Sequence, residues 1–446
     1  MLPADHDTIA AISTPPGTGG IAVLRLSGPD ALPAIAPLFS SFEKIKPRYA
    51  TFGKLIHPDL GEGEFDDCVV TFFESPHSAT GEDVVEISVH GGAFLQQKLL
   101  EVLLRAPSIR PAGAGEFTFR AFLRGKLDLS RAEAVADLIH AKDAAAHKNA
   151  RQQIQGGLRL LVNEMDTGLR QMLTQIEAEL DFSDQEIEFT PLESLLPGLS
   201  ELQSTCRALL ESYFYGRRLE EGIRVPLVGA PNSGKSSLFN LLLGEDRAIV
   251  TQQPGTTRDT IEKTIIVAGH SVVLVDTAGL RDTNDEIEAF GVGRSRDELE
   301  RADLVLVVHA PDTEDVTLEP SVDNSYITVY NKVDLDPAPP IGKDIYLSCA
   351  TKTGLSQLKE RIYSQVINMV SLGVDGVVLS NARHKDVFLR LTDQLTVCGR
   401  AIESQAGPEY LASDLRLALD ILGEISGRTT PDDILNQIFA GFCVGK

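Results

Sequence analysis

The chain has 446 residues, of which 43% are hydrophobic and 24% charged, so it is long enough for roughly two to four domains with ordinary cores. Its formal net charge of −23 at pH 7 argues against a broad, nonspecific nucleic-acid surface, although a local basic pocket stays compatible with it. No segment has the apolar length of a membrane span, the start lacks a signal-peptide pattern, and no Cys-x-x-Cys is present, so we expect a cytoplasmic protein without membrane contact, disulfide framework or zinc site.

The first 118 residues have the pattern of a mixed α/β domain. Strand-like runs cover 20–26, 68–73 and 83–89, and a helix is predicted over 94–104. The loop 13–20 is rich in glycine and proline. Its glycines permit an anion cradle, but a plain connector is the favoured interpretation.

Helical spacing takes over from Ala121 to about Gly216. Apolar residues recur at three- and four-residue intervals, and few helix breakers occur before Pro191. We predict that residues 119–216 form the first part of a helical domain.

A phosphate-binding loop is predicted at residues 229–236, which read Gly-x-x-x-x-Gly-Lys-Ser between a strand-like run and a helix-like run. Gly229 and Gly234 allow several backbone amides to point at one anion, and the helix N-terminus adds its positive end. Lys235 is expected to reach the outer phosphates and to act in catalysis, while Ser236 would bind Mg²⁺.

Two later motifs identify the nucleotide as GTP. The apolar run 271–276 ends at Asp276 and opens Asp-x-x-Gly, in which the acid orders Mg²⁺ through water and the Gly279 amide approaches the terminal phosphate. The run 326–330 leads into Asn-Lys-x-Asp, whose Asp334 carboxylate accepts two hydrogen bonds from guanine that adenine does not offer. Ser348, Cys349 and Ala350 fit the loop that closes over the base.

The residues expected around GTP are Asn232, Ser233, Gly234, Lys235, Ser236, Ser237, Thr251, Thr256, Thr257, Asp276, Thr277, Ala278, Gly279, Asn331, Lys332, Asp334, Ser348, Cys349 and Ala350. Thr257 is placed to join Ser236 in the magnesium shell.

The residue that orients the attacking water is not the usual glutamine, because Leu280 follows Asp-x-x-Gly. Acids at 282, 285, 286 and 288 are available, and position alone does not choose among them. Since an acid is repelled by triphosphate, additional positive charge is needed at the moment of reaction. The side-chain oxygen of Asn232 offers a site for a monovalent cation, or alternatively a hydrogen bond that stabilises the loop.

Helical spacing returns over 379–404, 410–425 and 432–442. Two helical tracts on either side of a nucleotide domain at 217–370 predict that this domain is inserted into a discontinuous helical domain, whose second part is 371–446; two separate helical domains are the alternative.

Over essentially its whole length the chain resembles the MnmE (TrmE) family of tRNA modification GTPases. Besides the nucleotide motifs, the resemblance rests on Thr-Pro-Pro-Gly near the start, Gly-Glu-Asp before Glu86, His-Gly-Gly at 90–92, Gly-Glu-Phe at 115–117, Ala-Phe-Leu-x-Gly-Lys-Leu-Asp-Leu at 121–129, Gly-Thr-Thr-Arg-Asp at 255–259, Asp-Thr-Ala-Gly-Leu-Arg at 276–281 and Phe-Cys-Val-Gly-Lys at 442–446.

The resemblance implies an N-terminal domain that forms a homodimer and binds a tetrahydrofolate one-carbon donor such as 5-formyltetrahydrofolate. It also implies a helical domain carrying an inserted Ras-like G domain. The implied partner is the FAD-dependent protein MnmG, in a heterotetramer that adds an aminomethyl-type group to carbon 5 of the wobble uridine of certain tRNAs.

The resemblance assigns further roles to individual residues. It places Arg25, Glu86, Lys126 and Lys446 at the folate, and it makes Glu288 the acid that orients water. The expected K⁺ ligands are Asn232, Thr251, Gln253 and Thr256. Gln253 replaces an aliphatic residue, which a backbone carbonyl ligand tolerates. Without the resemblance, Arg25 and Lys126 read as solvated charges.

Cys443 is expected to serve the modification chemistry, and a buried structural thiol at the end of an apolar helix is its alternative. Two other functions also stay open. A ribosome-assembly GTPase should carry a basic RNA-binding appendage, and the sequence shows none. A GTP-gated scaffold would have no covalent chemistry of its own.

Overall fold

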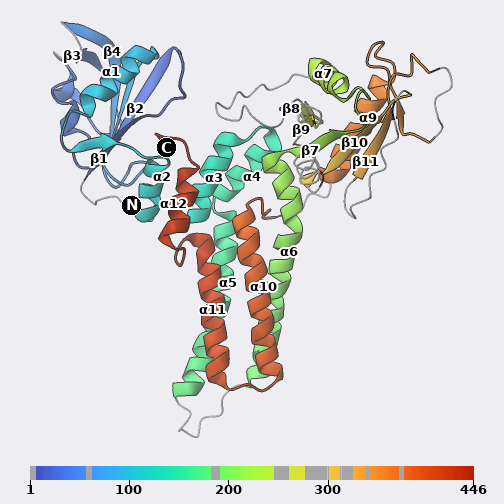
Figure 1. Cartoon of the computed structure of the whole chain (residues 1–446). Helices are drawn as coiled ribbons and strands as arrows, with labels where there is room; N and C mark the ends of the chain where they lie inside the picture. Colours follow the sequence, from blue (N-terminus) through green and yellow to red (C-terminus); the bar gives the residue numbers. More distant parts are fainter. Residues whose placement is uncertain are drawn as a thin grey trace, which may run out of the picture. The chain divides into compact units, whose positions relative to one another are not determined.

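The computed structural model describes residues 7–56, 63–181, 191–245, 261–276, 299, 301–311, 313, 325–336, 342–370 and 376–445 (Figure 1). The chain forms two compact units. The first consists of Met1–Ala136, Gln153–Gln185 and Ala412–Lys446, and the second of Asp137–Gln152 and Glu186–Leu411.

The first unit contains a six-stranded sheet in the order β3-β4-β5-β2-β1-β6. Its strands are β1 (Thr8–Ile12), β2 (Ile21–Ser27), β3 (Ala50–Ile56), β4 (Glu64–Phe73), β5 (Val84–His90) and β6 (Ile109–Pro111). All neighbours are antiparallel except β1 and β6. Along β2, Ala22, Leu24 and Leu26 face a buried core, so the alternate residue Arg25 faces the other side of the sheet.

Helix α1 (Ala93–Leu103) packs on this core, into which it buries Leu99, Val102 and Leu103. Two short 3₁₀ helices, η1 (Pro33–Ile35) and η2 (Phe42–Lys44), lie between β2 and β3. The three strands and the helix predicted for this part of the sequence are confirmed.

Five helices lie wholly or mostly in the first unit: α2 (Glu116–Leu123), α3 (Leu129–His140), α5 (Gly157–Asp181), α11 (Pro408–Ser426) and α12 (Asp432–Ala440). Phe119 of α2 and Phe439 of α12 pack against each other in a tilted arrangement, with ring centroids 4.9 Å apart. Arg416 of α11 reaches Glu177 of α5 at 2.7 Å. Helices from both ends of the sequence therefore pack together within this unit.

A buried arginine ties the sheet of the first unit to α2. Arg120 is 3% exposed, and its guanidinium contacts the carboxylates of Asp7 at 2.6 Å, Glu82 at 3.0 Å and Glu116 at 3.1 Å. Burial alone would raise the pKa of Glu116, but hydrogen bonds from Arg110 and the Gly113 amide outweigh burial and lower this pKa below its ordinary value.

Glu116→Gln should lower the free energy of unfolding near neutral pH by about 1 to 3 kcal/mol, because it removes an acceptor charge from this network. The lowered pKa means that the charge stabilises the fold above the unfolded-state pKa of Glu116, and that this stability disappears as pH falls through the folded-state pKa. The difference between wild type and variant should therefore shrink on acidification. Urea titrations followed by circular dichroism over a series of pH values check this; a constant difference would contradict it.

The second unit contains a sheet in the order β12-β11-β10-β7-β9-β8. Its strands are β7 (Ile223–Val228), β8 (Ile261–Val267), β9 (His270–Asp276), β10 (Leu304–His309), β11 (Ser325–Tyr330) and β12 (Ile345–Tyr346). All neighbours are parallel except β8 and β9. Parallel strands covered on both faces are continuous apolar runs, and every residue of β10 is buried.

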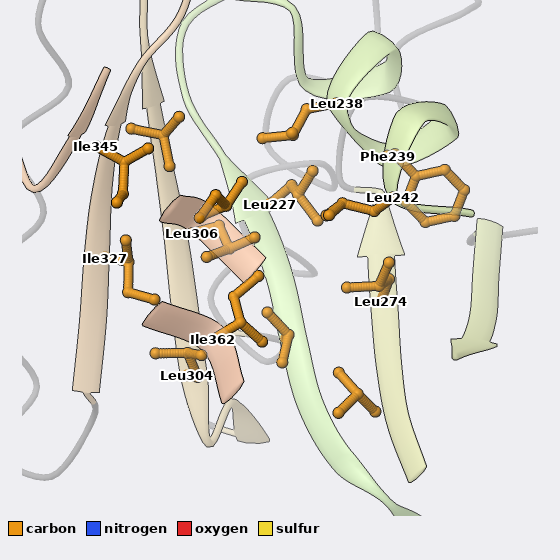
Figure 2. Close-up of a cluster of buried hydrophobic side chains, with 14 of the residues drawn as sticks. Leu227, Leu238, Phe239, Leu242, Leu274, Leu304, Leu306, Ile327, Ile345 and Ile362 are labelled. Carbon is orange, nitrogen blue, oxygen red and sulfur yellow. The ribbon is translucent and has the colours of Figure 1, made fainter. Parts of the chain in front are cut away.

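Helices α7 (Lys235–Glu245) and α9 (Leu355–Val370) pack on this sheet. Figure 2 shows Leu227 and Leu274, from strands β7 and β9, beside Leu238 and Leu242 of α7. Ile362 of α9 belongs to the same cluster. This core fixes α7 directly after β7, which is the arrangement that a phosphate-binding loop needs.

The helices α4 (Ala144–Ile154), α6 (Leu196–Glu221) and α10 (Ala382–Glu403) and the 3₁₀ helix η4 (Leu192–Leu195) complete the second unit. The backbone passes close to α6 at Gly216, where an added Cβ would meet the Leu379 carbonyl oxygen at 2.0 Å. At the start of α4, Asp143 Oδ1 accepts hydrogen bonds from the Ala145 and Ala146 amides. The other oxygen of Asp143 accepts the Ser271 amide of β9 at 2.8 Å.

A buried carboxylate joins α6 to the second sheet. Asp303 Oδ1 accepts hydrogen bonds from Arg217 Nη2 at 2.8 Å and Arg218 Nε at 2.9 Å, and Oδ2 accepts the Arg224 amide at 2.9 Å. The Asp303 side chain is only 3% exposed. Its charge is therefore compensated by groups of α6 and β7.

Asp303→Ala should lower the free energy of unfolding of the second unit by roughly 3 to 5 kcal/mol, because removal of one partner of a buried charge pair leaves the other uncompensated. Asp386→Ala is the matched control. Asp386 pairs with Arg390 on the surface of α10 and is 67% exposed, so its loss should cost less than about 1 kcal/mol. Guanidinium unfolding followed by circular dichroism compares the two; equal midpoints would show that Asp303 is not a structural anchor.

Candidate functional site

The phosphate-binding loop lies between the end of β7 and the start of α7, as its motif predicts. An added Cβ at Gly229 would meet the Val308 carbonyl oxygen at 2.2 Å. Gly234 has φ +92°, and a Cβ there would lie 2.1 Å from Asn331 Nδ2. Both positions thus require glycine, which keeps the backbone open to an anion. Lys235 is 8% exposed, and its ammonium donates to the Gly229 and Ala230 carbonyls at 3.0 and 2.8 Å.

The polar side chains that the loop offers differ in exposure. Ser233 is buried, whereas Asn232, Ser236 and Ser237 are exposed. Asn232 has φ +62°, and its amide group makes no hydrogen bond within the described part of the chain. Both interpretations of Asn232, a cation ligand and a residue whose hydrogen bond stabilises the loop, stay predictions.

Asn331 connects the phosphate-binding loop to the expected base-binding loop. It is 2% exposed, donates from Nδ2 to the Ser233 carbonyl at 3.0 Å and accepts the Cys349 amide at 3.3 Å. Ser348 is fully buried and its Oγ accepts the Thr351 amide at 3.1 Å. The motif asparagine thus positions both loops around one edge of the sheet.

The remaining described nucleotide residues lie at the same edge. Asp276 ends β9 and is 3% exposed, while Lys332 and Asp334 follow β11, with Asp334 exposed. Burial raises the pKa of the Cys349 thiol above its ordinary value, which disfavours the nucleophilic thiolate. Because the carboxyl ends of parallel strands form this edge, the arrangement is that of a nucleotide site.

The donor set fits Mg²⁺ as well as phosphate. The exposed hydroxyl of Ser236 in the first turn of α7 and the carboxylate at the end of β9 supply the oxygen ligands that Mg²⁺ prefers. Several sequence predictions lie outside the described residues: Thr251, Gln253, Thr256, Thr257, Thr277, Ala278, Gly279, Glu288 and Lys446. For these the expected roles in binding GTP, K⁺, Mg²⁺ or folate and in catalysis stay predictions.

The expected folate residues Arg25 and Glu86 meet on the first sheet, directly opposite each other on β2 and β5. Arg25 Nη2 and Nε donate to Glu86 Oε1 at 2.7 and 3.0 Å, and the guanidinium lies 5.7 Å from the centre of the Phe117 ring. Both charged side chains keep about a quarter of their surface exposed, at 23% and 28%. Lys126 is exposed and donates to the Pro76 carbonyl at 2.8 Å.

The segment that follows α12 lies against the same unit (Figure 1). Val444 forms an antiparallel bridge with Ala114, and the Gly115 amide donates to the Cys443 carbonyl at 3.3 Å. Helix α12 ends before Cys443, whose side chain is exposed. The alternative of a buried structural thiol at this position is therefore wrong.

The sequence analysis missed two contacts of this segment. Ser13 Oγ donates to the Gly445 carbonyl at 3.0 Å, and Arg25 Nη1 lies 3.5 Å from the same oxygen. Ser13 opens the loop 13–20 that was interpreted as a plain connector. Only the tertiary structure brings residues 13 and 445 together.

Two family models match the chain. The MnmE helical domain matches residues 129–443, and the N-terminus of GTP-binding protein TrmE matches residues 8–126. The chain belongs to the MnmE family of tRNA modification GTPases. The resemblance seen in the sequence is thereby confirmed, as are the GTPase class and the fold class of mixed α/β and helical parts with a P-loop GTPase domain.

MnmE relatives match the chain along its whole length. The tRNA modification GTPase MnmE of Christiangramia forsetii is 36% identical over 99% of this chain and 99% of its own. That of Thermoanaerobacter sp. strain X514 is 39% identical, again over 99% of both. The G domain of the T. maritima FeoB iron transporter is 26% identical over 32% of this chain and 98% of its own, with a TM-score of 0.25 that supports no inference. Within the described ranges, no helix of this chain is both long and apolar enough to cross a membrane.

Proposed function

We propose that the chain hydrolyses GTP to support tRNA modification, in which an aminomethyl or carboxymethylaminomethyl group is added to carbon 5 of the wobble uridine of certain tRNAs. A tetrahydrofolate one-carbon donor, such as 5-formyltetrahydrofolate, supplies the carbon, and an FAD-dependent protein of the MnmG type is the partner. The observation that carries the proposal is that one chain of the MnmE family combines a phosphate-binding loop in its second unit with the Arg25–Glu86 pair and an exposed thiol in its first.

The GTPase part of the mechanism uses groups at the edge of the second sheet. The loop amides and Lys235 would bind the phosphates, Ser236 would bind Mg²⁺ directly, and Asp276 would hold its water shell. Mg²⁺ neutralises charge that develops on the phosphates. Hydrolysis in this proposal drives a conformational change and supplies none of the atoms added to tRNA.

The modification part uses groups of the first unit. The guanidinium of Arg25 has donors left over beyond its bonds to Glu86, and it lies over the ring of the buried Phe117, which supports its position. Lys126 and Lys446 are proposed to bind the folate's negative groups, and Cys443 to act on or position an intermediate. The N-terminal domain is proposed to dimerise and to form a heterotetramer with the partner in the cytoplasm.

The proposed domain ranges are 1–118 for the folate-binding domain, 119–216 and 371–446 for the two parts of the helical domain, and 217–370 for the G domain. The alternative functions, a ribosome-assembly GTPase and a scaffold, leave no role for the exposed thiol of Cys443 or for the Arg25–Glu86 pair.

The test is nucleoside analysis of tRNA from a strain lacking this gene. We expect the wobble-uridine modification to disappear and to return when the gene is supplied in trans. Normal nucleosides together with defective ribosomal particles in the deletion strain would favour the ribosome-assembly alternative instead.

Asp334→Asn should shift nucleotide preference from GTP toward XTP by about tenfold or more, because the new amide presents a donor to guanine's donors but matches the 2-oxo group of xanthine. Asp336→Asn is the matched control, since Asp336 accepts the Tyr330 hydroxyl at 2.7 Å and is not expected to contact the base. Competition binding with GTP and XTP measures the change. Unchanged preference in the Asp334 variant would mean that other groups read the base.

A further inference from the structure

The segment after α12 is attached to the first unit at two points, one on each side of Val444. On one side the Gly115 amide donates to the Cys443 carbonyl, and on the other Ser13 Oγ donates to the Gly445 carbonyl at 3.0 Å. Two backbone carbonyls are thus held by hydrogen bonds, that of Cys443 itself and that of Gly445 two residues later. The attachment uses backbone oxygens and one hydroxyl, so the thiol itself is left unengaged by it.

Neither anchor point tolerates a side chain larger than hydrogen. Gly445 is buried at φ +91°, and an added Cβ would lie 2.5 Å from the Ile12 carbonyl oxygen. Gly115 has φ +63°, and a Cβ there would lie 2.7 Å from the Phe439 carbonyl oxygen. Such close backbone approach in left-handed geometry requires glycine. By contrast, Gly441 in the same segment has φ −76°, with its nearest neighbour for a Cβ at 3.4 Å.

Ser13 connects this attachment to the candidate folate residues. It lies one residue beyond β1, which pairs with β2, the strand that carries Arg25. Arg25 Nη1 lies 3.5 Å from the same Gly445 oxygen that Ser13 binds at 3.0 Å. The hydroxyl therefore fixes this oxygen without drawing the guanidinium away from Glu86.

We propose that Ser13 and Gly445 form a clasp that fixes the segment bearing Cys443 beside the Arg25–Glu86 pair. Ser13 is then a positioning residue for the tRNA modification, and it acts through the backbone of Gly445. The effect of the clasp on tRNA modification rests on the proposed function. The contact between Ser13 and Gly445 does not, because it belongs to the structure of the first unit.

The test compares four variants of the full-length chain. Ser13→Ala removes the hydroxyl, and Ser13→Thr retains one. Gly445→Ala introduces the clash with Ile12, and Gly441→Ala is its matched control, a glycine-to-alanine change in the same segment with room for a methyl group. Hydrogen exchange of the Gly115 amide reports whether the segment stays attached, because its acceptor is the Cys443 carbonyl, two residues before Gly445. Modified-nucleoside content in a complemented deletion strain reports function, and GTP hydrolysis serves as an internal control.

We expect Gly115 exchange to accelerate about tenfold or more in Gly445→Ala and several-fold in Ser13→Ala, with modification falling in the same order. Ser13→Thr and Gly441→Ala should match wild type in both, and all four should keep wild-type GTP hydrolysis. Unchanged exchange in Ser13→Ala and Gly445→Ala would overturn the clasp. Faster exchange with full modification would overturn the positioning role, and so would failure of Ser13→Thr to rescue. If wild type itself restores no modified uridine, the proposed function fails, and the exchange data alone decide whether the clasp exists.

Discussion

Cys443→Ser is expected to abolish wobble-uridine modification while GTP hydrolysis stays within about twofold of wild type. Serine reproduces the size of the side chain, but its hydroxyl is far less acidic and less nucleophilic than a thiol. The exposed thiol lies in the first unit, whereas the phosphate-binding loop belongs to the second. The two activities should therefore separate in a single variant.

Val444→Ala is the matched control for the cysteine variant, because Val444 is the neighbouring residue and its side chain is 57% exposed. It should retain both activities. GTPase rate and modified-nucleoside content are measured on the same preparations. Full modification with serine in place would remove the chemical role of Cys443, and loss of both activities would indicate a folding defect.

Glu288→Ala should lower the rate of GTP hydrolysis by about a hundredfold or more while GTP affinity changes little, since this acid is assigned to the transition state and not to ground-state binding. Glu286→Ala is the control within the same loop. Single-turnover hydrolysis and equilibrium nucleotide binding distinguish the two effects. If the Glu286 variant loses activity and the Glu288 variant does not, the role belongs to the neighbouring acid.

We also expect GTP hydrolysis to require K⁺. Leu280 cannot orient water and the sequence supplies no unambiguous arginine for the reaction, so a cation ligated by Asn232 would provide the missing positive charge. Replacing K⁺ with Na⁺ at constant ionic strength should reduce hydrolysis steeply. Equal rates in the two salts would exclude this role for a selective cation.

The sequence predicted three strands of the second sheet from their apolar runs. The apolar runs ending at Val228, Asp276 and Tyr330 are strands β7, β9 and β11, and their loops carry the nucleotide motifs. Other strands escaped prediction, namely β1, β3, β6 and β8 and also β10, although every residue of β10 is buried. β1 has five residues and β6 three, and in β3 the apolar Phe52 is 62% exposed whereas Thr51 is buried, so its hydrophobic pattern does not follow its buried face. Local pattern is weak in such segments, and pairing within the sheet defines them.

In the candidate sites, too, residues close together in the sequence were predictable, whereas contacts between distant residues were not. The phosphate-binding loop is local in sequence, so its residues and its strand-to-helix context were predictable. The contact between Arg25 and Glu86 depends on the register of β2 against β5, and the contact between Ser13 and Gly445 spans nearly the whole chain. A single sequence contains no local signal for such tertiary contacts. The resemblance to a family named Arg25 and Glu86, but nothing pointed to Ser13.

The hydrogen bond from the Ser271 amide to Asp143 joins helix α4 to the sheet of the second unit, and exchange of this amide can report on that connection. The Asp143 carboxylate caps α4 and also accepts the Ser271 amide near one end of β9, while Asp276 at the other end of that strand faces the nucleotide edge. Five residues of extended chain, about 17 Å, separate the two. The solvent-exchange rate of the Ser271 amide therefore measures how firmly the sheet is attached to the helical segment, from a position remote from bound nucleotide. The exchange rate of the Ser271 amide can be recorded with GDP, with a GTP analogue and without nucleotide. A change among these states would show that nucleotide bound near Asp276 affects the opposite end of β9, and the measurement needs neither a label nor a substitution.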